Sequence, residues 1–136
     1  MRITEINPAD TWVIRHKVMW PDQPPAFVRI ADDEAGTHYG LFLDEKLVSV
    51  VSCFQSGRQM QFRKFATLQE YQGRGFGTHL LTYVIDKARQ NGVAQLWCHA
   101  RRDKKEFYEK FGLAEPQEPN RFVRAGREYT RMEMSL

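Results

Sequence analysis

The stretch YQGRGFGTHLL, residues 71–81, decides the fold, because it opens with closely spaced glycines and then turns apolar. The glycines occupy alternate positions: Gly73, Gly75 and Gly77. From Phe76 to Ala88 apolar residues recur at helical spacing, and Gly92 follows where a helix C-terminal cap is expected. Residues 60–68 alternate between apolar and polar side chains, as a strand does. The sequence therefore predicts a strand, a glycine-rich turn and a long amphipathic helix.

The turn at residues 72–78 leads into a helix N-terminus, which is a natural anion site. The first amides of a helix have no intrahelical acceptor and lie at the positive end of the helix dipole. Glycines let phosphate oxygens approach the backbone and allow positive φ angles. The spacing fits a pyrophosphate cradle, and equally a tight turn with close helix–strand packing. It matches neither the P-loop nor the G-x-G-x-x-G motif of dinucleotide-binding folds, whose third glycine would stand one position later.

The rest of the chain predicts an α+β domain around a mixed, mostly antiparallel sheet flanked by helices. Its 136 residues are the length of one domain, so we expect a single domain over residues 1–136. Hydrophobic periodicity predicts the following elements in order: a strand at 2–6, a helix at 8–20, a long loop at 21–37, hairpin strands at 39–43 and 47–54, a strand at 60–68, the main helix, a strand at 93–100, a short helix opened by a capping box at Asp103 and Glu106, and one or two closing strands.

Composition narrows the class of function. A net charge of +3 suits an anionic ligand but is weak for a dedicated nucleic-acid binder. Cys53 and Cys98 lie in apolar runs without metal-ligand spacing, which predicts reduced core residues, a cytoplasmic protein and no metal site. No segment approaches the roughly 18 apolar residues of a membrane span, so no membrane association is expected.

Two segments together resemble the GCN5-related N-acetyltransferase (GNAT) superfamily. FATLQEYQGRGFGTHLLTYVIDKARQNGV carries the Gln/Arg-x-x-Gly-x-Gly/Ala acetyl-CoA signature, and FYEKFGL matches the C-terminal Phe-Tyr-x-Lys-x-Gly-Phe/Leu segment. Residues 100–113 also resemble the ElaA-like subgroup. The resemblance implies the GNAT fold, acetyl-CoA as co-substrate, and transfer of the acetyl group to an amine of a small molecule or peptide. It also allows a homodimer, since family members are often dimers.

The resemblance assigns cofactor-binding residues in two groups. The pyrophosphate is expected on the main-chain amides of the signature: Gln72, Gly73, Arg74, Gly75, Phe76, Gly77 and Thr78. The pantetheine arm is expected to pair with the preceding strand at Phe65, Ala66 and Thr67. The Phe65 amide falls where the family polarises the acetyl carbonyl, and such a donor acts like an oxyanion hole.

Tyr108 falls at the family's general-acid position, where a hydroxyl can protonate the departing thiolate. Taken alone, it also fits a core tyrosine on a short amphipathic helix. The chain departs from the family pattern twice: Arg101 stands where an asparagine often binds pantetheine, and Gln61 stands where some members carry a catalytic glutamate. Arg101 could contact a phosphate instead, or the contact could be absent. The base, if one is needed, is then elsewhere or is a water relay; His99 is the candidate, against a structural histidine at the end of a strand.

Direct attack in a ternary complex is favoured over an acyl-enzyme, because neither cysteine has an activating base beside it in the sequence. The alternative from another class is a GNAT-like domain that binds acyl-CoA as a sensor or interaction module. Nucleic-acid binding through residues 100–105 is not favoured, because those charges also suit a solvated helix start. The resemblance implies acceptor contacts from residues 12–37 and 121–134, and these segments do not identify the acceptor.

Overall fold

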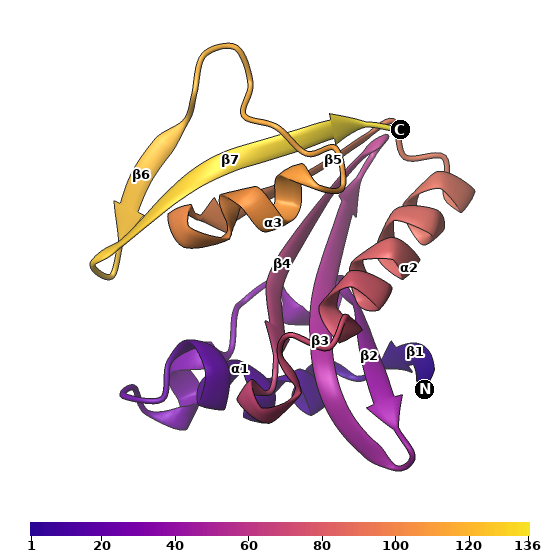
Figure 1. Ribbon diagram of the computed structural model, residues 1–136, viewed down its shortest axis with the longest axis vertical. Coiled ribbons are helices and arrows are strands. Elements are labelled where there is room, and N and C mark those ends of the chain that lie inside the picture. Colours follow the sequence, from indigo (N-terminus) through magenta and orange to yellow (C-terminus); the bar gives the residue numbers. More distant parts are fainter. The chain divides into compact units, whose positions relative to one another are not determined.

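The computed structural model describes residues 1–136 as a seven-stranded sheet with three α-helices (Figure 1). The strands are β1 (Arg2–Ile6), β2 (Thr37–Leu43), β3 (Lys46–Ser56), β4 (Gln59–Thr67), β5 (Gln95–Arg101), β6 (Arg121–Arg124) and β7 (Arg127–Ser135). The helices are α1 (Pro8–Met19), α2 (Phe76–Gln90) and α3 (Lys105–Glu109). The strand order is β1-β2-β3-β4-β5-β7-β6, with β4 and β5 parallel and the β1–β2, β2–β3, β5–β7 and β6–β7 pairs antiparallel. The predicted fold class is confirmed.

The predicted order of elements also holds, with one correction at the short C-terminal helix. The expected capping box at Asp103 and Glu106 is wrong. A 3₁₀ turn occupies Arg102–Lys104, and α3 begins only at Lys105, with no side-chain cap. The Asp103 carboxylate instead accepts a hydrogen bond from Arg101 Nη2 at 3.2 Å. The closing region forms two strands, β6 and β7.

The chain divides into two compact units. Unit 1 comprises Met1–Phe54 and Phe62–Lys87, and unit 2 comprises Gln55–Gln61 and Ala88–Leu136. None of the helices has the length and apolar character needed to cross a membrane.

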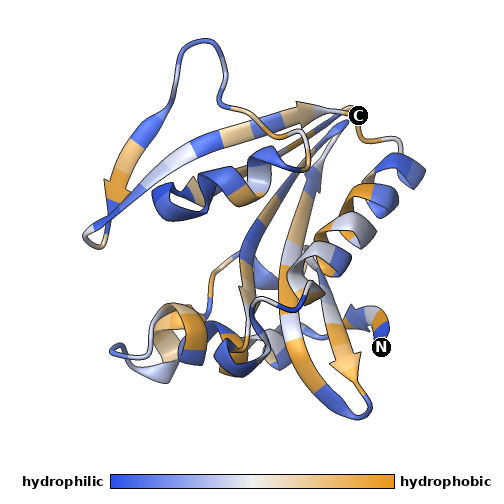
Figure 2. Ribbon diagram, viewed as in Figure 1, coloured by the Kyte–Doolittle hydropathy of each residue, from blue (hydrophilic) through white to orange (hydrophobic).

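In unit 1, α1 and α2 cover opposite faces of the β2–β3 pair. Ile14 of α1 packs in a buried cluster with Val50 of β3. Tyr39 of β2, which pairs with Val51, instead meets Tyr83 of α2 with ring centroids 5.4 Å apart. Adjacent residues of a strand point to opposite faces, so the two helices lie on opposite sides. The predicted apolar stripe of α2 is buried at Leu80, Leu81, Val84, Ile85 and Ala88, and Figure 2 shows its alternation with hydrophilic residues.

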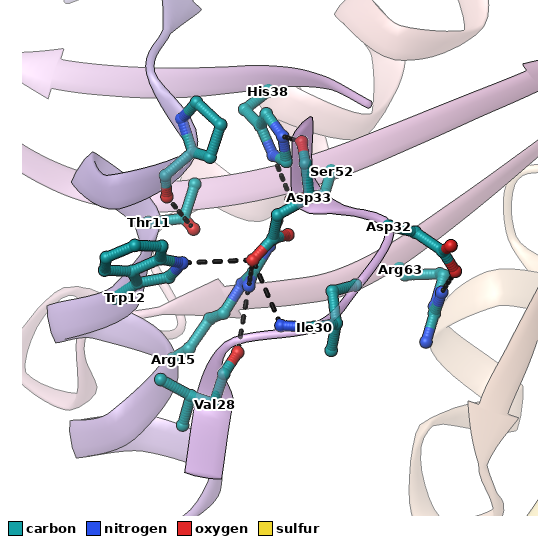
Figure 3. A network of polar contacts seen from close by, with 11 residues as sticks. Thr11, Trp12, Arg15, Val28, Ile30, Asp32, Asp33, His38, Ser52 and Arg63 are labelled. Atoms are coloured by element: carbon teal, nitrogen blue, oxygen red, sulfur yellow. Dashed lines mark hydrogen bonds and ion pairs between the residues drawn. The ribbon is translucent and has the colours of Figure 1, made fainter. Parts of the chain in front are cut away.

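A buried ion pair fixes the long segment between α1 and β2 (Figure 3). Arg15 of α1 is fully buried and donates to both carboxylate oxygens of Asp33, at 3.0 and 2.9 Å. Asp33 Oδ2 also accepts from Trp12 Nε1 at 3.1 Å and from the Ile30 amide at 3.2 Å. Burial by itself would raise the pKa of Asp33, but these donors and the Arg15 charge lower it. The carboxylate therefore remains ionised and holds the segment to α1.

A histidine and a serine extend this network without forming a nucleophilic site. Arg15 Nη2 donates to Ser52 Oγ at 2.8 Å, and Ser52 Oγ lies 2.6 Å from His38 Nδ1. His38 Nε2 lies 2.8 Å from the Asp33 carbonyl, an obligatory acceptor, so Nε2 carries a proton and donates to it. Ser52 and His38 are at most 1% exposed, so no substrate reaches this pair. The network is a structural connection between α1, β2 and β3.

In unit 2, α3 contacts β5 of the three-stranded β5–β7–β6 sheet. One face of β5 carries Leu96, Cys98 and Ala100, all buried, and Met132 of β7 lies opposite Cys98. The other face carries Trp97, His99 and Arg101, which are only half-buried. The alternation along residues 93–100 predicts one face with Ala94, Leu96, Cys98 and Ala100, and the burial of the last three confirms it.

Candidate functional site

The glycine turn before α2 has the backbone conformation that a phosphate cradle requires. Gly73 and Gly75 have φ angles of 77° and 84°, in the left-handed region that favours glycine. The first intrahelical donor beyond the turn is His79, whose amide bonds to the Gly75 carbonyl at 3.0 Å. In an α-helix the amides that precede this donor have no acceptor within the helix. A Cβ atom added at Gly73 or Gly75 would meet nothing within 4 Å, so this backbone is approachable from solvent and fits a pyrophosphate.

Side chains fix the turn to the end of β4. Gln72 Nε2 donates to the Thr67 carbonyl at 2.8 Å, which joins the first residue of the signature to the strand before it. Ser49 of β3 donates to the Ala66 carbonyl at 3.2 Å, and its Oγ lies 2.8 Å from Thr67 Oγ1. Unit 1 therefore brings the predicted pantetheine strand and the predicted pyrophosphate turn together. Sequence reasoning missed Ser49, since a serine in a buried strand carries no motif.

An irregularity in β4 directly precedes the predicted carbonyl-polarising amide. Lys64 has a φ of 56°, which is rare for a residue with a side chain, especially inside a strand. A local break of this kind re-aims the backbone groups beside it. Phe65 follows immediately in the chain. No sequence pattern signalled this feature, because a lysine is ordinarily compatible with a regular strand.

Two exposed cations lie beside the glycine turn. The Arg74 guanidinium lies over the Tyr71 ring, 5.4 Å from its centroid, and Lys46 Nζ lies 5.2 Å from the same centroid. Lys46 is the first residue of β3, directly after the turn from β2, and was not among the predicted residues. These contacts place two positive charges near a backbone that already favours anions.

Tyr108, the predicted acid, belongs to α3 in unit 2. Burial of its hydroxyl raises its pKa above the usual value, the nearby Cys98 adds to this, and the Arg101 charge opposes it. The phenol therefore keeps its proton across the neutral range and can donate it. Arg101, predicted as a candidate phosphate contact, is close enough to act electrostatically on Tyr108 and also pairs with Asp103.

His99, the predicted base, lies in an aromatic setting. Its ring meets Trp97 and Phe122 edge to face, with centroids 5.1 and 4.8 Å away. Unit 2 therefore contains His99, Arg101 and Tyr108, whereas unit 1 contains the predicted cofactor residues from Phe65 to Thr78. His99 and Arg101 project from one face of β5, opposite to Cys98.

Neither cysteine is suited to nucleophilic catalysis. Cys53 and Cys98 are free thiols, and both are buried. Burial raises the pKa of each thiol to about 12, so neither ionises at neutral pH. The prediction of reduced core cysteines is confirmed.

The sequence matches the Acetyltransferase (GNAT) family over residues 6–113. Among curated proteins it is 30% identical over 128 residues to "Uncharacterized N-acetyltransferase YitI" from Bacillus subtilis (strain 168). That alignment covers 88% of this chain and 86% of the relative.

Several solved structures share the fold. A putative N-acetyltransferase from Lactobacillus plantarum superimposes with a TM-score of 0.84 at 20% identity, covering 100% of this chain and 99% of the other. Escherichia coli ElaA gives 0.80 at 14% identity and 97% coverage of both chains. A GNAT acetyltransferase from Elizabethkingia anophelis, solved with acetyl-CoA bound, gives 0.76 at 15% identity, covering 99% and 97%. The family match and the 30% identical relative show that the chain belongs to the GNAT family of N-acetyltransferases, for which acetyl-CoA is the co-substrate.

Proposed function

We propose that the protein transfers an acetyl group from acetyl-CoA to a primary amine of a small molecule or peptide, with residues 1–136 acting as one acetyltransferase domain. The observation that carries this proposal is the turn before α2, where Gly73 and Gly75 adopt positive φ angles and leave the backbone open to an anion. The thioester supplies an activated acyl group. The chain's part is to bind, orient and polarise it, and to supply a proton.

The residues of unit 1 are assigned to binding. Amides from Gln72 to Thr78 hold the pyrophosphate, and Arg74 adds positive charge beside them. The β4 backbone at Phe65, Ala66 and Thr67 binds the pantetheine arm, supported by the Ser49 and Gln72 hydrogen bonds. The Phe65 amide polarises the acetyl carbonyl. A fixed donor of this type lowers a barrier by about 2.7–4 kcal/mol in other enzymes.

The residues of unit 2 are assigned to proton transfer. Tyr108 protonates the departing sulfur, a role supported by a hydroxyl that stays protonated at neutral pH. Gln61 cannot accept a proton at neutral pH, so His99 is assigned as the base that deprotonates the amine, directly or through water. The amine attacks the acetyl group directly, because the two thiols are buried and protonated. Their free state is consistent with the reducing cytoplasm.

The test is release of free CoA thiol from acetyl-CoA in the presence of a panel of primary amines. We expect thiol release above background hydrolysis with at least one amine, and a mass increase of one acetyl group on that amine. In Tyr108→Phe, turnover should fall by roughly 10²–10⁴, the usual contribution of a positioned acid, while the CoA dissociation constant changes little. Tight CoA binding without turnover on any amine would favour the sensor function instead. Turnover within threefold of the parent in Tyr108→Phe would refute the acid assignment.

A further inference from the structure

A nearly buried carboxylate lies just after α3 in unit 2. The Glu115 side chain is 11% exposed, and four donor atoms contact its carboxylate oxygens. Arg121 donates through Nε and Nη2 to its two oxygens at 3.0 and 3.1 Å, Thr130 Oγ1 donates at 2.9 Å, and Lys105 Nζ lies 2.7 Å from Oε1. These partners come from β6, β7 and the first residue of α3. No part of the proposed chemistry uses Glu115.

The helix that carries Tyr108 depends on contacts at its two ends. It has five residues and no side-chain cap, whereas isolated helices below about 12–15 residues are marginal in water. Its C-terminal end is held by Gly112, with a φ of 97°, and by a two-way backbone bridge between Ala114 and Glu133 at 3.0 and 2.9 Å. Its first residue is Lys105, which the structure pairs with Glu115. Glu115 therefore links both ends of the segment that contains Tyr108.

The geometry points to Glu115 as a positioning residue that, through Lys105, fixes the orientation of α3 and so of the Tyr108 hydroxyl. Lys105 precedes Tyr108 by three residues, a spacing that puts two side chains on the same side of a helix. Arg121 and Thr130 anchor the carboxylate to the β6–β7 hairpin, so the orientation of α3 is coupled to that of the hairpin. This inference rests on the proposed role of Tyr108 as the acid.

A cavity beside Glu115 offers a route to test the carboxylate itself. It has a volume of about 450 Å³, and its lining includes Arg102, Lys105, Glu115, Arg121 and Glu128. A small carboxylate can enter such a space once the Glu115 side chain is removed. Glu128 provides a matched control in the same cavity. Its carboxylate pairs with Arg102 at 2.8 Å, its side chain is 58% exposed, and this ion pair involves neither Lys105 nor Tyr108.

The experiment is a double-mutant cycle on kcat, with KM for acetyl-CoA measured alongside. Glu115→Gln should lower kcat roughly 10- to 100-fold, since a 1 Å misplacement of a reacting group can cost about 10²-fold. KM for acetyl-CoA should stay within about twofold, because binding is assigned to unit 1. In the Tyr108→Phe background, Glu115→Gln should cost less than about twofold, because no hydroxyl is left to orient. Glu128→Gln should match the parent in both backgrounds.

Two further variants keep the inference testable if Glu115→Gln unfolds. Lys105→Met breaks the link to α3 but leaves Glu115 paired with Arg121 and Thr130, and it should show the same Tyr108-dependent loss. Glu115→Ala should regain activity with added formate, and the parent should not respond. An equal loss with and without the Tyr108 hydroxyl would overturn the positioning role while sparing the acid assignment. A Tyr108→Phe enzyme as active as the parent would overturn both.

Discussion

Replacing Asp33 with asparagine should unfold the protein at much lower denaturant concentration. Asp33→Asn keeps the shape of the side chain but removes the charge that balances Arg15, which is fully buried. Oδ2 of Asp33 faces three donors, from Arg15, Trp12 and Ile30, and Oδ1 faces a fourth, the second Arg15 donor. Whichever way the new amide turns, its NH₂ group meets at least one N–H that previously donated to an oxygen.

The expected loss is about 3–5 kcal/mol, the usual cost of leaving one member of a buried ion pair without its partner. Domains of this size have about 5–15 kcal/mol of stability in total, so the loss is a large share of it. The effect also has a pH signature. The pKa of Asp33 is lowered from its ordinary value of 3.8, so its stabilisation is present above that value and is lost as the pH falls below it.

Urea unfolding followed by circular dichroism at pH 7 measures the loss directly. The matched control is Asp32→Asn, the neighbouring residue, whose ion pair with Arg63 at 3.2 Å is 68% exposed on the aspartate side. Exposed pairs contribute about 0–1 kcal/mol, so this variant should remain close to the parent. If Asp33→Asn cost no more than Asp32→Asn, the Arg15 network would not be what holds the segment before β2.

Hydrogen bonds from Arg121, Lys105 and Thr130 lower the pKa of Glu115 from 4.5 to about 2. The difference in unfolding free energy between the parent and Glu115→Gln should therefore shrink as the pH falls from 4.5 towards 2. Urea midpoints measure this difference, and a constant difference would contradict the prediction. Cys53 and Cys98 should react with a thiol reagent only after denaturation, because both are buried and protonated; rapid labelling of the folded protein would contradict their burial. Gly92→Ala should cost roughly 1–2 kcal/mol in a urea titration, because Gly92 caps α2 with a φ of 73°; an unchanged midpoint would argue against that cap.

The fold was predictable from the sequence where one local signal coincided with the tertiary structure. The apolar stripe from Leu80 to Ala88 and the alternation along β5 both reflect burial on one face, and both are buried as expected. The positive φ angles at Gly73 and Gly75 were predictable because few other residues adopt them.

The features that escaped prediction depend on residues far apart in the chain. The Arg15 network joins α1 to residues 18 and 37 positions later, and Glu115 binds partners on three different elements. Lys64 adopts a positive φ although its side chain favours an ordinary strand. The capping box at Asp103 failed for a different, local reason, because Asp103 lies inside the 3₁₀ turn Arg102–Lys104 and its carboxylate pairs with Arg101, two residues earlier. The long-range contacts leave no mark on local sequence patterns.

The central claim, that CoA binds on the glycine turn before α2, is tested most directly by urea unfolding of Gly75→Val with and without CoA. In the parent, CoA at 100 times its dissociation constant should add about 2.7 kcal/mol to the free energy of unfolding. Gly57→Val is the control, since Gly57 also has a positive φ, of 60°, and no atom within 4 Å of an added Cβ, but lies in the β3–β4 turn. Both variants should lose stability from backbone strain. The account predicts that Gly57→Val keeps the CoA-dependent gain and that Gly75→Val loses it; a full gain in Gly75→Val would contradict the account.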